Sequence, residues 1–113
     1  MKATHGFDFK EKRVCLTMYS LKSDEKQYVD HLRNWVIEGS NTRSHWKILD
    51  TRSAPDLKGY HDPKTCECSH WSPESFRYLR LRQPGSYGGG ILPLSQIEFF
   101  GTLSERIELT GNP

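Results

Sequence analysis

The sequence has no long hydrophobic run. Hydrophobic residues make up 35% of its 113 residues, and no stretch approaches the roughly 20 apolar residues that a membrane-spanning helix needs. The first segment, MKATHGFDFKEKRV, has no apolar core of the kind found in a secretion signal. We therefore expect a soluble chain without a secretion signal.

An excess of one charge is also missing. Sixteen basic residues stand against fourteen acidic ones, which gives a net charge of +2, and the two signs are interspersed. A nucleic-acid-binding domain usually concentrates its basic residues in a patch or stripe. The composition therefore argues against nucleic acid as a partner.

Cysteine is scarce. The chain has three, Cys15, Cys66 and Cys68, and this odd number at irregular spacing does not indicate a disulfide framework. A reducing, intracellular compartment is the simpler interpretation.

In CECSH, alternate spacing puts Cys66, Cys68 and His70 on one face of a strand. His61 lies nearby in sequence, but structural zinc sites usually use CxxC-type turns that let four ligands converge. We expect reduced thiols that pack in a strand, and neither a metal nor another cofactor.

No familiar catalytic motif is present. The chain lacks GxSxG, HExxH and P-loop patterns, and the glycines at 88–90 precede a predicted strand rather than a phosphate-binding helix N-terminus. A nucleophilic cysteine would need a positioned His and an oxyanion donor, which the sequence does not reveal. We expect a protein that is not an enzyme.

What the chain does have is a series of short segments in which apolar and polar residues alternate, separated by turns rich in Gly, Pro, Ser, Asn or Asp. Short strands at this spacing favour an antiparallel β-sandwich or barrel. An aromatic content of 12% with few aliphatic residues suits a thin core between two sheets. In VCLTMYSL the alternation places Val14, Leu16 and Met18 on one face. The residues that we predict to be buried in the core are Trp35, Trp46, Leu79, Leu81, Ile97 and Phe99.

Two tryptophans, Trp35 and Trp46, begin two of these alternating runs. Trp35 shares a face with Ile37 in NWVIEGS, and Trp46 shares one with Ile48 in HWKILDT. The turn GSNTRS between them would join adjacent strands. Because a buried aromatic side chain contributes about 150–250 Å² to a core, we expect both rings between the sheets rather than at a ligand site.

The order of five segments resembles that of a known family. The segments are FDFKEKRV, MYSLKS, LRNWVIEGSNTRSHWKILDTR, FRYLRLRQPG and LSQIEFFGTL, and they run from about Gly6 to Leu103. The series resembles the discoidin, or coagulation-factor type C, domains, which are galactose-binding-like jelly rolls. It is most similar to the intracellular branch found in proteins with BTB, Kelch-type or ubiquitin-ligase regions. The resemblance implies an all-β, antiparallel jelly-roll β-sandwich over residues 1–103 and a C-terminal tail over residues 104–113.

The chain departs from this family in two ways. Family members have one or two further strands before the segment equivalent to FDFKEKRV, so the resemblance implies a domain without its N-terminal strands. Such a domain would have an exposed sheet edge that invites dimerisation.

The second departure concerns sugar binding. The resemblance implies that a His, an Arg and an Asn contact the sugar in galactose-binding members, and here the corresponding residues are Ser20, His31 and Arg33. Tyr87, in the loop PGSYGGGILP, remains as an aromatic residue that could stack on a sugar.

Two functions stay open. The first, which we favour from the sequence, is a non-catalytic module whose loops bind a protein partner within a larger assembly. KSDEKQYVDHLR offers the mixed charge and the Tyr or Arg anchor that such a site needs. The second is a galactose-binding-like carbohydrate-binding module, with a glycan as the partner.

The jelly-roll order implies that the connection from Ser20 to Arg33 and the loop from Gly85 to Pro93 lie at one end of the sandwich. The predicted ligand-binding residues are Lys22, Asp24, Glu25, Tyr28, His31, Arg33 and Tyr87.

Overall fold

The computed structural model describes residues 3–23, 34–52, 64–84 and 94–105. Within these ranges the chain forms strands and no helix, because the alternating segments put apolar side chains on one face of an extended backbone. Accordingly, no described helix is long and apolar enough to cross a bilayer. The strands are β1 (Ala3–Asp8), β2 (Lys12–Ser23), β3 (Trp35–Ser40), β4 (Lys47–Arg52), β5 (Lys64–Glu67), β6 (Tyr78–Gln83) and β7 (Leu94–Glu105).

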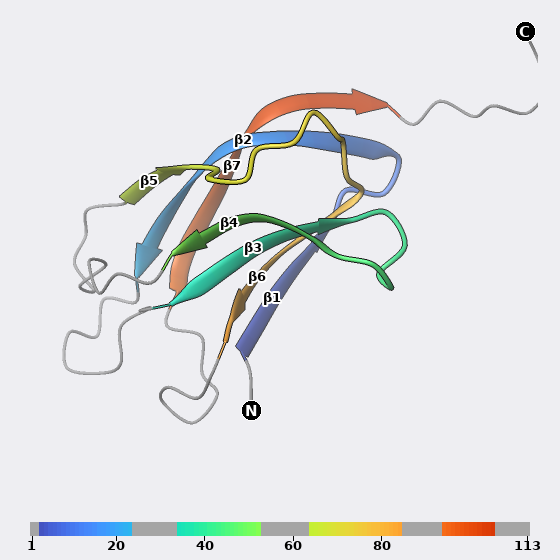
Figure 1. The fold of residues 1–113 in the computed structure, drawn as a ribbon. Coiled ribbons are helices and arrows are strands. Elements are labelled where there is room, and N and C mark those ends of the chain that lie inside the picture. The colour runs from blue at the N-terminus through green and yellow to red at the C-terminus, as the bar shows by residue number, and fades with distance from the viewer. Residues whose placement is uncertain (1–2, 24–33, 53–63, 85–93, 106–113) are drawn as a thin grey trace, which may run out of the picture.

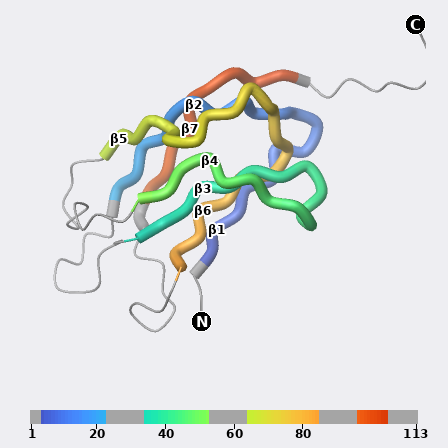
Figure 2. Tube along the Cα trace, viewed as in Figure 1, coloured from blue at the N-terminus to red at the C-terminus, as the bar shows by residue number. Residues whose placement is uncertain are grey.

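The strands form two antiparallel sheets that pack face to face (Figure 1, Figure 2). One sheet has the order β1-β6-β3-β4 and the other has the order β5-β2-β7. Every strand pairing is antiparallel. The predicted all-β antiparallel sandwich is confirmed. Among the described strands, β1, β4, β5 and β7 lie at sheet edges, and dimerisation through such an edge stays a prediction.

The core lies between the two sheets. In β6 the alternation buries Leu79 and Leu81, as predicted, and Trp35 is buried as well. Ile97 and Phe99 are only half-buried and pack against the core, because their strand, β7, is an outer strand of the smaller sheet. The buried core cluster consists of Val14, Leu16, Tyr19, Leu21, Trp35, Ile37, Leu49, Cys66, Phe76, Leu79 and Leu81.

Trp46 is the residue for which the predicted core is wrong. Its strand, β4, begins one residue later, and the buried residues of β4 are Leu49 and Asp50, while Ile48 is 43% exposed. The pairing of β3 with β4 contains a register shift, so the alternation assumed from the sequence does not hold across it. Trp46 itself is half-buried and belongs to the turn before β4, where its Nε1 donates a hydrogen bond of 3.0 Å to the carbonyl oxygen of Arg43.

A second register shift reverses the alternation of β2. Val14 and Leu16 face the core as predicted, but the pairing of β2 with β7 shifts between Leu16 and Met18. Beyond this shift the buried hydrophobic residues are Tyr19 and Leu21, and Met18 is half-buried. The prediction for Met18 is therefore wrong, and the phenol of Tyr19 lies in the core instead.

A polar network joins the two sheets inside the core. Tyr19 of β2 donates its hydroxyl hydrogen to a carboxylate oxygen of Asp50 in β4, which is 0% exposed. Trp35 Nε1 donates to the Tyr19 hydroxyl at 2.8 Å. Asp50 also accepts hydrogen bonds from Arg52 Nε at 2.9 Å and from the backbone N–H of Ser69 at 2.8 Å. Burial alone raises the pKa of Asp50, but the hydrogen bonds from Tyr19, Ser69 and Arg52 lower it by more, so the carboxylate stays charged.

The three cysteines are free thiols. Burial raises the pKa of the Cys66 thiol, and it raises the pKa of Cys68 to about 11. Because the thiolate is the reactive and metal-binding form of cysteine, both residues are suited to packing rather than to chemistry. Within the described ranges, no group of three or more His, Cys, Asp or Glu residues could hold a metal ion.

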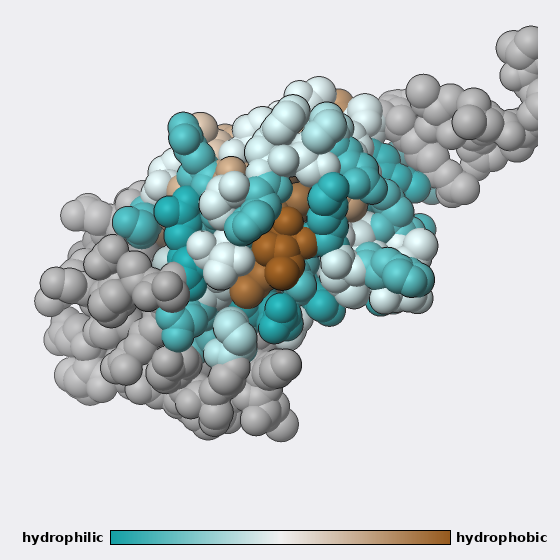
Figure 3. Space-filling view, in the orientation of Figure 1, coloured by the Kyte–Doolittle hydropathy of each residue, from teal (hydrophilic) through white to brown (hydrophobic). Residues whose placement is uncertain are grey.

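Most of the surface seen in Figure 3 is hydrophilic, with one compact hydrophobic area in the middle of the view. Exposed apolar residues that occur singly are normal on protein surfaces. The large hydrophobic side chains that the described part of the chain exposes are Ile48, Trp71, Phe100 and Leu103. They come from β4, from the segment before β6 and from β7.

Candidate functional site

The structure describes one of the seven predicted binding residues. Lys22 lies half-buried near the end of β2. Four strands border the two predicted binding connections, and their ends pair two by two: Ser23 of β2 pairs with Leu94 of β7, and Val36 of β3 pairs with Arg82 of β6 (Figure 1). The binding site predicted at this end of the sandwich stays a prediction. Its other residues lie outside the described ranges: Asp24, Glu25, Tyr28, His31, Arg33 and Tyr87.

A different site lies on the outer face of the four-stranded sheet. Side chains alternate across a strand, so β1 and β6 direct every second residue away from the core. The register places Gly6 beside Arg80 and Asp8 beside Tyr78, and Arg80 is next to Glu38 of β3. This face therefore carries polar and aromatic side chains in rows across the sheet.

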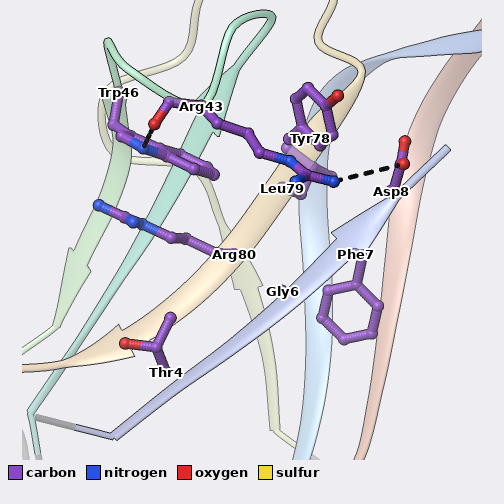
Figure 4. A pocket seen from close by; sticks show the side chains of 9 residues that line it. All are labelled: Thr4, Gly6, Phe7, Asp8, Arg43, Trp46, Tyr78, Leu79 and Arg80. Atoms are coloured by element: carbon purple, nitrogen blue, oxygen red, sulfur yellow. Dashed lines mark hydrogen bonds and ion pairs between the residues drawn. The ribbon is translucent and has the colours of Figure 1, made fainter. Parts of the chain in front are cut away.

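Between these rows lies a pocket of about 290 Å³. Gly6 lines this pocket without a side chain, and a Cβ atom at this position would meet nothing within 4 Å. In Figure 4, Trp46 and Arg43 border one side of the hollow and Thr4 borders the other. The lining residues are Thr4, Gly6, Phe7, Asp8, Arg43, Trp46, Tyr78, Leu79 and Arg80.

The turn between β3 and β4 supplies the first wall of the pocket. Ser40 Oγ accepts hydrogen bonds from the backbone N–H groups of Thr42 and Arg43. Arg43 has a φ of 69°, a left-handed conformation that costs a non-glycine residue about 1–2 kcal/mol. Its carbonyl oxygen accepts the hydrogen bond from Trp46 Nε1, and Arg80 Cζ lies 3.8 Å from the centroid of the Trp46 ring (Figure 4). This is cation–π geometry, so the indole is held by both a hydrogen bond and a stacked guanidinium.

Tyr78, at the start of β6, supplies the second wall. Two guanidinium groups lie against its ring, with Arg43 Cζ at 4.6 Å and Arg77 Cζ at 4.8 Å from the centroid. Arg77 also donates to both carboxylate oxygens of Asp8, from Nε at 2.9 Å and from Nη2 at 3.2 Å. This hydrogen bonding lowers the pKa of Asp8 to about 2, so the carboxylate is charged at neutral pH.

Glu38 fixes the position of Arg80. The Glu38 carboxylate accepts hydrogen bonds from Arg80 Nε at 2.8 Å and from Arg82 Nε at 3.0 Å and Nη2 at 3.3 Å. Burial alone raises the pKa of Glu38, but the hydrogen bonds from Arg82 and Arg80 lower it by more. Among the described residues, the Nη atoms of Arg80 have no hydrogen-bond acceptor, so they can donate to a ligand.

The pocket therefore combines two aromatic rings with guanidinium donors around a hollow in the sheet face. Aromatic faces contact apolar C–H groups, and guanidinium N–H groups form directed hydrogen bonds with oxygen atoms. Such a set of groups can orient a small polar ligand.

Sequence reasoning misses this site. The alternation of β6 correctly puts Tyr78 and Arg80 on the face opposite Leu79, but assigning Trp46 to the core excludes it from a ligand site. The detectable signal is the run of aromatic and basic residues on the polar face of FRYLRLRQ. What no sequence pattern reveals is that this run lies beside Gly6.

No family model matches the chain, and no curated protein matches it. Solved structures do match. CBM62 from Clostridium thermocellum Xyl5A is 24% identical, with a TM-score of 0.68, over 88% of this chain and 68% of that one. The C-terminal domain of a chitobiase from Bacteroides fragilis is 11% identical, with a TM-score of 0.67, over 93% of this chain and 66% of that one. The family 32 carbohydrate-binding module of Streptococcus pneumoniae EndoD is 7% identical, with a TM-score of 0.59, over 88% of this chain and 69% of that one.

These similarities show the fold. The two carbohydrate-binding modules are galactose-binding-like β-sandwiches, so the predicted galactose-binding-like architecture is confirmed. This chain spans about two thirds of the length of each matched structure. None of the three is named as a discoidin domain, and membership of that family and of its intracellular branch stays a prediction.

Proposed function

We propose that this protein is a non-catalytic carbohydrate-binding module that holds a saccharide in the pocket beside Gly6. The proposal rests on the pocket itself, in which aromatic rings and guanidinium groups surround a hollow in the sheet face. The fold supports it, because two of the similar structures are named as carbohydrate-binding modules. It is the second of the two functions that the sequence leaves open.

The pocket contains the groups that saccharide binding requires. A sugar ring presents C–H groups that pack on aromatic faces, and hydroxyl groups that need well-placed polar partners. Trp46 and Tyr78 supply rings that border the hollow and that carry guanidinium groups on part of their surface, and Arg80 supplies donors. Because Glu38 and Trp46 already fix the Arg80 side chain, it loses little conformational freedom when a ligand binds, which favours affinity.

The protein-partner function that the sequence favoured stays a prediction. It depends on the charges of residues 22–33 and on Tyr87, of which the structure describes only Lys22. We place the saccharide function first because its site can be built from described side chains.

A glycan array probed with wild-type protein and the Gly6→Val variant tests the proposal. Valine favours β-strands, and its Cβ has free space at this position, so the variant should fold while its side chain fills the pocket. We expect the wild type to bind at least one defined saccharide and Gly6→Val to lose that binding. Thr102→Val, at an exposed position of β7 in the other sheet, is the matched control and should bind like the wild type.

A second pair of variants tests the aromatic wall. Trp46→Ala removes a pocket ring, whereas Trp71→Ala removes a 56% exposed tryptophan that does not line the pocket. We expect only Trp46→Ala to weaken saccharide binding. The proposal fails if no saccharide binds, or if Gly6→Val binds as tightly as the wild type. In that case a pull-down from cell extract, in which both proteins capture the same partner, would favour the protein-partner function.

A further inference from the structure

We propose that the pocket selects saccharides that carry a carboxylate or a sulfate, and that Arg43 binds this anionic group. The inference depends on the proposed saccharide function and adds the charge of the ligand to it. Carboxylate and sulfate present the same chemistry to a guanidinium, which is a pair of negatively charged oxygen atoms that accept two parallel hydrogen bonds.

Positive charge is in excess around the pocket. Four arginines and two acids give this site an excess of two positive charges. A hollow lined by one sign of charge raises the local concentration of ions of the opposite sign. The charged side chains in and beside the pocket are four arginines and two acids: Arg43, Arg77, Arg80, Arg82, Asp8 and Glu38.

The two acids oppose an anion only weakly, because arginines already neutralise them. Asp8 accepts two hydrogen bonds from Arg77. Glu38 is 5% exposed and is bound by both Arg80 and Arg82. Both carboxylates are therefore already paired with arginines, and they repel an incoming anion less than unpaired carboxylates would.

Arg43 is the arginine of this group that is held least tightly. Among the described residues its guanidinium has no hydrogen-bond acceptor, and it forms only a long ion pair with Asp8, in which Nη2 lies 3.8 Å from Oδ2, beyond hydrogen-bond distance. Its side chain is 64% exposed. Arg43 can therefore bind an anion without breaking an existing hydrogen bond.

Arg43 is also positioned for this role. Its backbone is fixed by hydrogen bonds to Ser40 and from Trp46, and its guanidinium stacks on Tyr78 above the hollow (Figure 4). A sugar ring placed over Gly6, beside the Arg80 guanidinium, would bring a carboxylate or sulfate substituent within reach of this group. Stacking restricts the side chain beforehand, so less freedom is lost on binding.

Matched pairs of oligosaccharides test the inference by isothermal titration calorimetry. One pair is an oligogalacturonate and its carboxyl-reduced neutral counterpart, and the other is a carrageenan oligosaccharide and its desulfated counterpart. We expect the wild type to bind an anionic member about tenfold more tightly than its neutral counterpart, which is the size of one charge-assisted hydrogen bond. The preference should shrink as salt is raised from about 0.05 to 0.5 M. A preference in only one pair supports the inference and identifies which anion the pocket accepts.

Substitutions of Arg43 separate its charge from its geometry. Arg43→Asn removes the charge, and asparagine tolerates the left-handed backbone of this position, so the preference for the anionic member should disappear while the protein stays folded. Arg43→Lys keeps the charge without the planar fork and should retain only part of the preference. Lys64→Gln removes one positive charge from β5 in the other sheet and should leave the preference unchanged.

The outcomes distinguish this inference from the proposed function. Equal binding of anionic and neutral members would overturn the inference and leave the saccharide function intact. No binding of any member would overturn the inference, and the glycan array would decide separately whether the saccharide function stands. Binding of the anionic members that persists in both Gly6→Val and Arg43→Asn would indicate general attraction to a basic surface, and would overturn the inference as well.

Discussion

Two clusters of carboxylate and arginine lie on opposite faces of the same four-stranded sheet. The inner cluster surrounds Asp50, whose carboxylate is satisfied by Tyr19, Arg52 and Ser69 and joins the two sheets. The outer cluster surrounds Glu38, whose arginine partners lie at the edge of an open pocket. The same residue types therefore have different roles. Inside, the carboxylate stabilises the packing of the sheets, whereas outside, the arginines keep donors for a ligand.

The largest expected effect comes from breaking the inner cluster. Asp50→Ala leaves the buried hydroxyl of Tyr19 without its acceptor and removes the carboxylate that pairs with Arg52, whose side chain is 31% exposed. Removing one partner of a buried charged pair costs about 3–5 kcal/mol, a large part of the stability of a domain of this size. Urea unfolding measures the loss. Glu98→Ala, at an exposed position of β7, is the control and should change stability by less than about 0.5 kcal/mol. An Asp50→Ala protein of near wild-type stability would contradict the role of the inner cluster.

The two tryptophans sharpen the comparison between the faces. Trp35→Ala creates a cavity between the sheets and removes the hydrogen bond to Tyr19, so it should cost about 3–5 kcal/mol. Trp46→Ala should cost about 1–2 kcal/mol, because its ring is half-buried and packs under Arg80 on the outer face. Equal losses of stability in urea unfolding would show that Trp46 belongs to the core after all.

Acid should weaken both clusters. The pKa values of Asp50, Glu38 and Asp8 are lowered in the folded state. A carboxyl group of this kind stabilises the fold above its unfolded pKa, and the contribution is lost as the pH falls through the folded pKa. For Asp8 this interval runs from 3.8 to about 2. We expect the urea midpoint to be flat above about pH 5 and to decrease below it, with a shallower decrease in Asp50→Asn. A midpoint that stays constant down to about pH 2 would refute this account.

The smallest expected effect is that of filling the pocket. Gly6→Val should leave the free energy of unfolding within about 0.5 kcal/mol of the wild type or raise it slightly, because glycine is unfavourable in a strand and the new side chain meets free space. Gly39→Val is the matched substitution on the inner face, where a Cβ would lie 2.6 Å from the Phe76 ring. It should destabilise the protein by about 1–3 kcal/mol. Thermal unfolding of both variants measures the contrast, and similar losses for the two would mean that the pocket is not open.

Much of the fold could be predicted from the sequence, because strict alternation identifies a half-buried strand. Leu79 and Leu81 are buried for this reason. The prediction fails for Met18 and Trp46, which lie near register shifts in the pairings of β2 and β4. A bulge changes the face that a side chain occupies without requiring a particular residue type, so the pattern alone could not reveal it.

The candidate site was less predictable than the fold. It depends on the register that puts Gly6 of β1 beside Arg80 of β6, two residues that are far apart in the sequence. The pocket also depends on an absent side chain, which composition and periodicity do not detect. Sequence reasoning could identify Trp46 as important, but its place in the turn with Arg43 required the structure.

Nuclear magnetic resonance titration of the wild-type protein with a saccharide that binds on the array tests the central claim most directly. If the pocket is the binding site, the largest shift changes will occur at the backbone amides of Thr4, Gly6 and Arg80 and at the indole N–H of Trp46. Changes confined to residues 24–33 and 85–93, with none at these four positions, would place the ligand at the other predicted site and contradict the account.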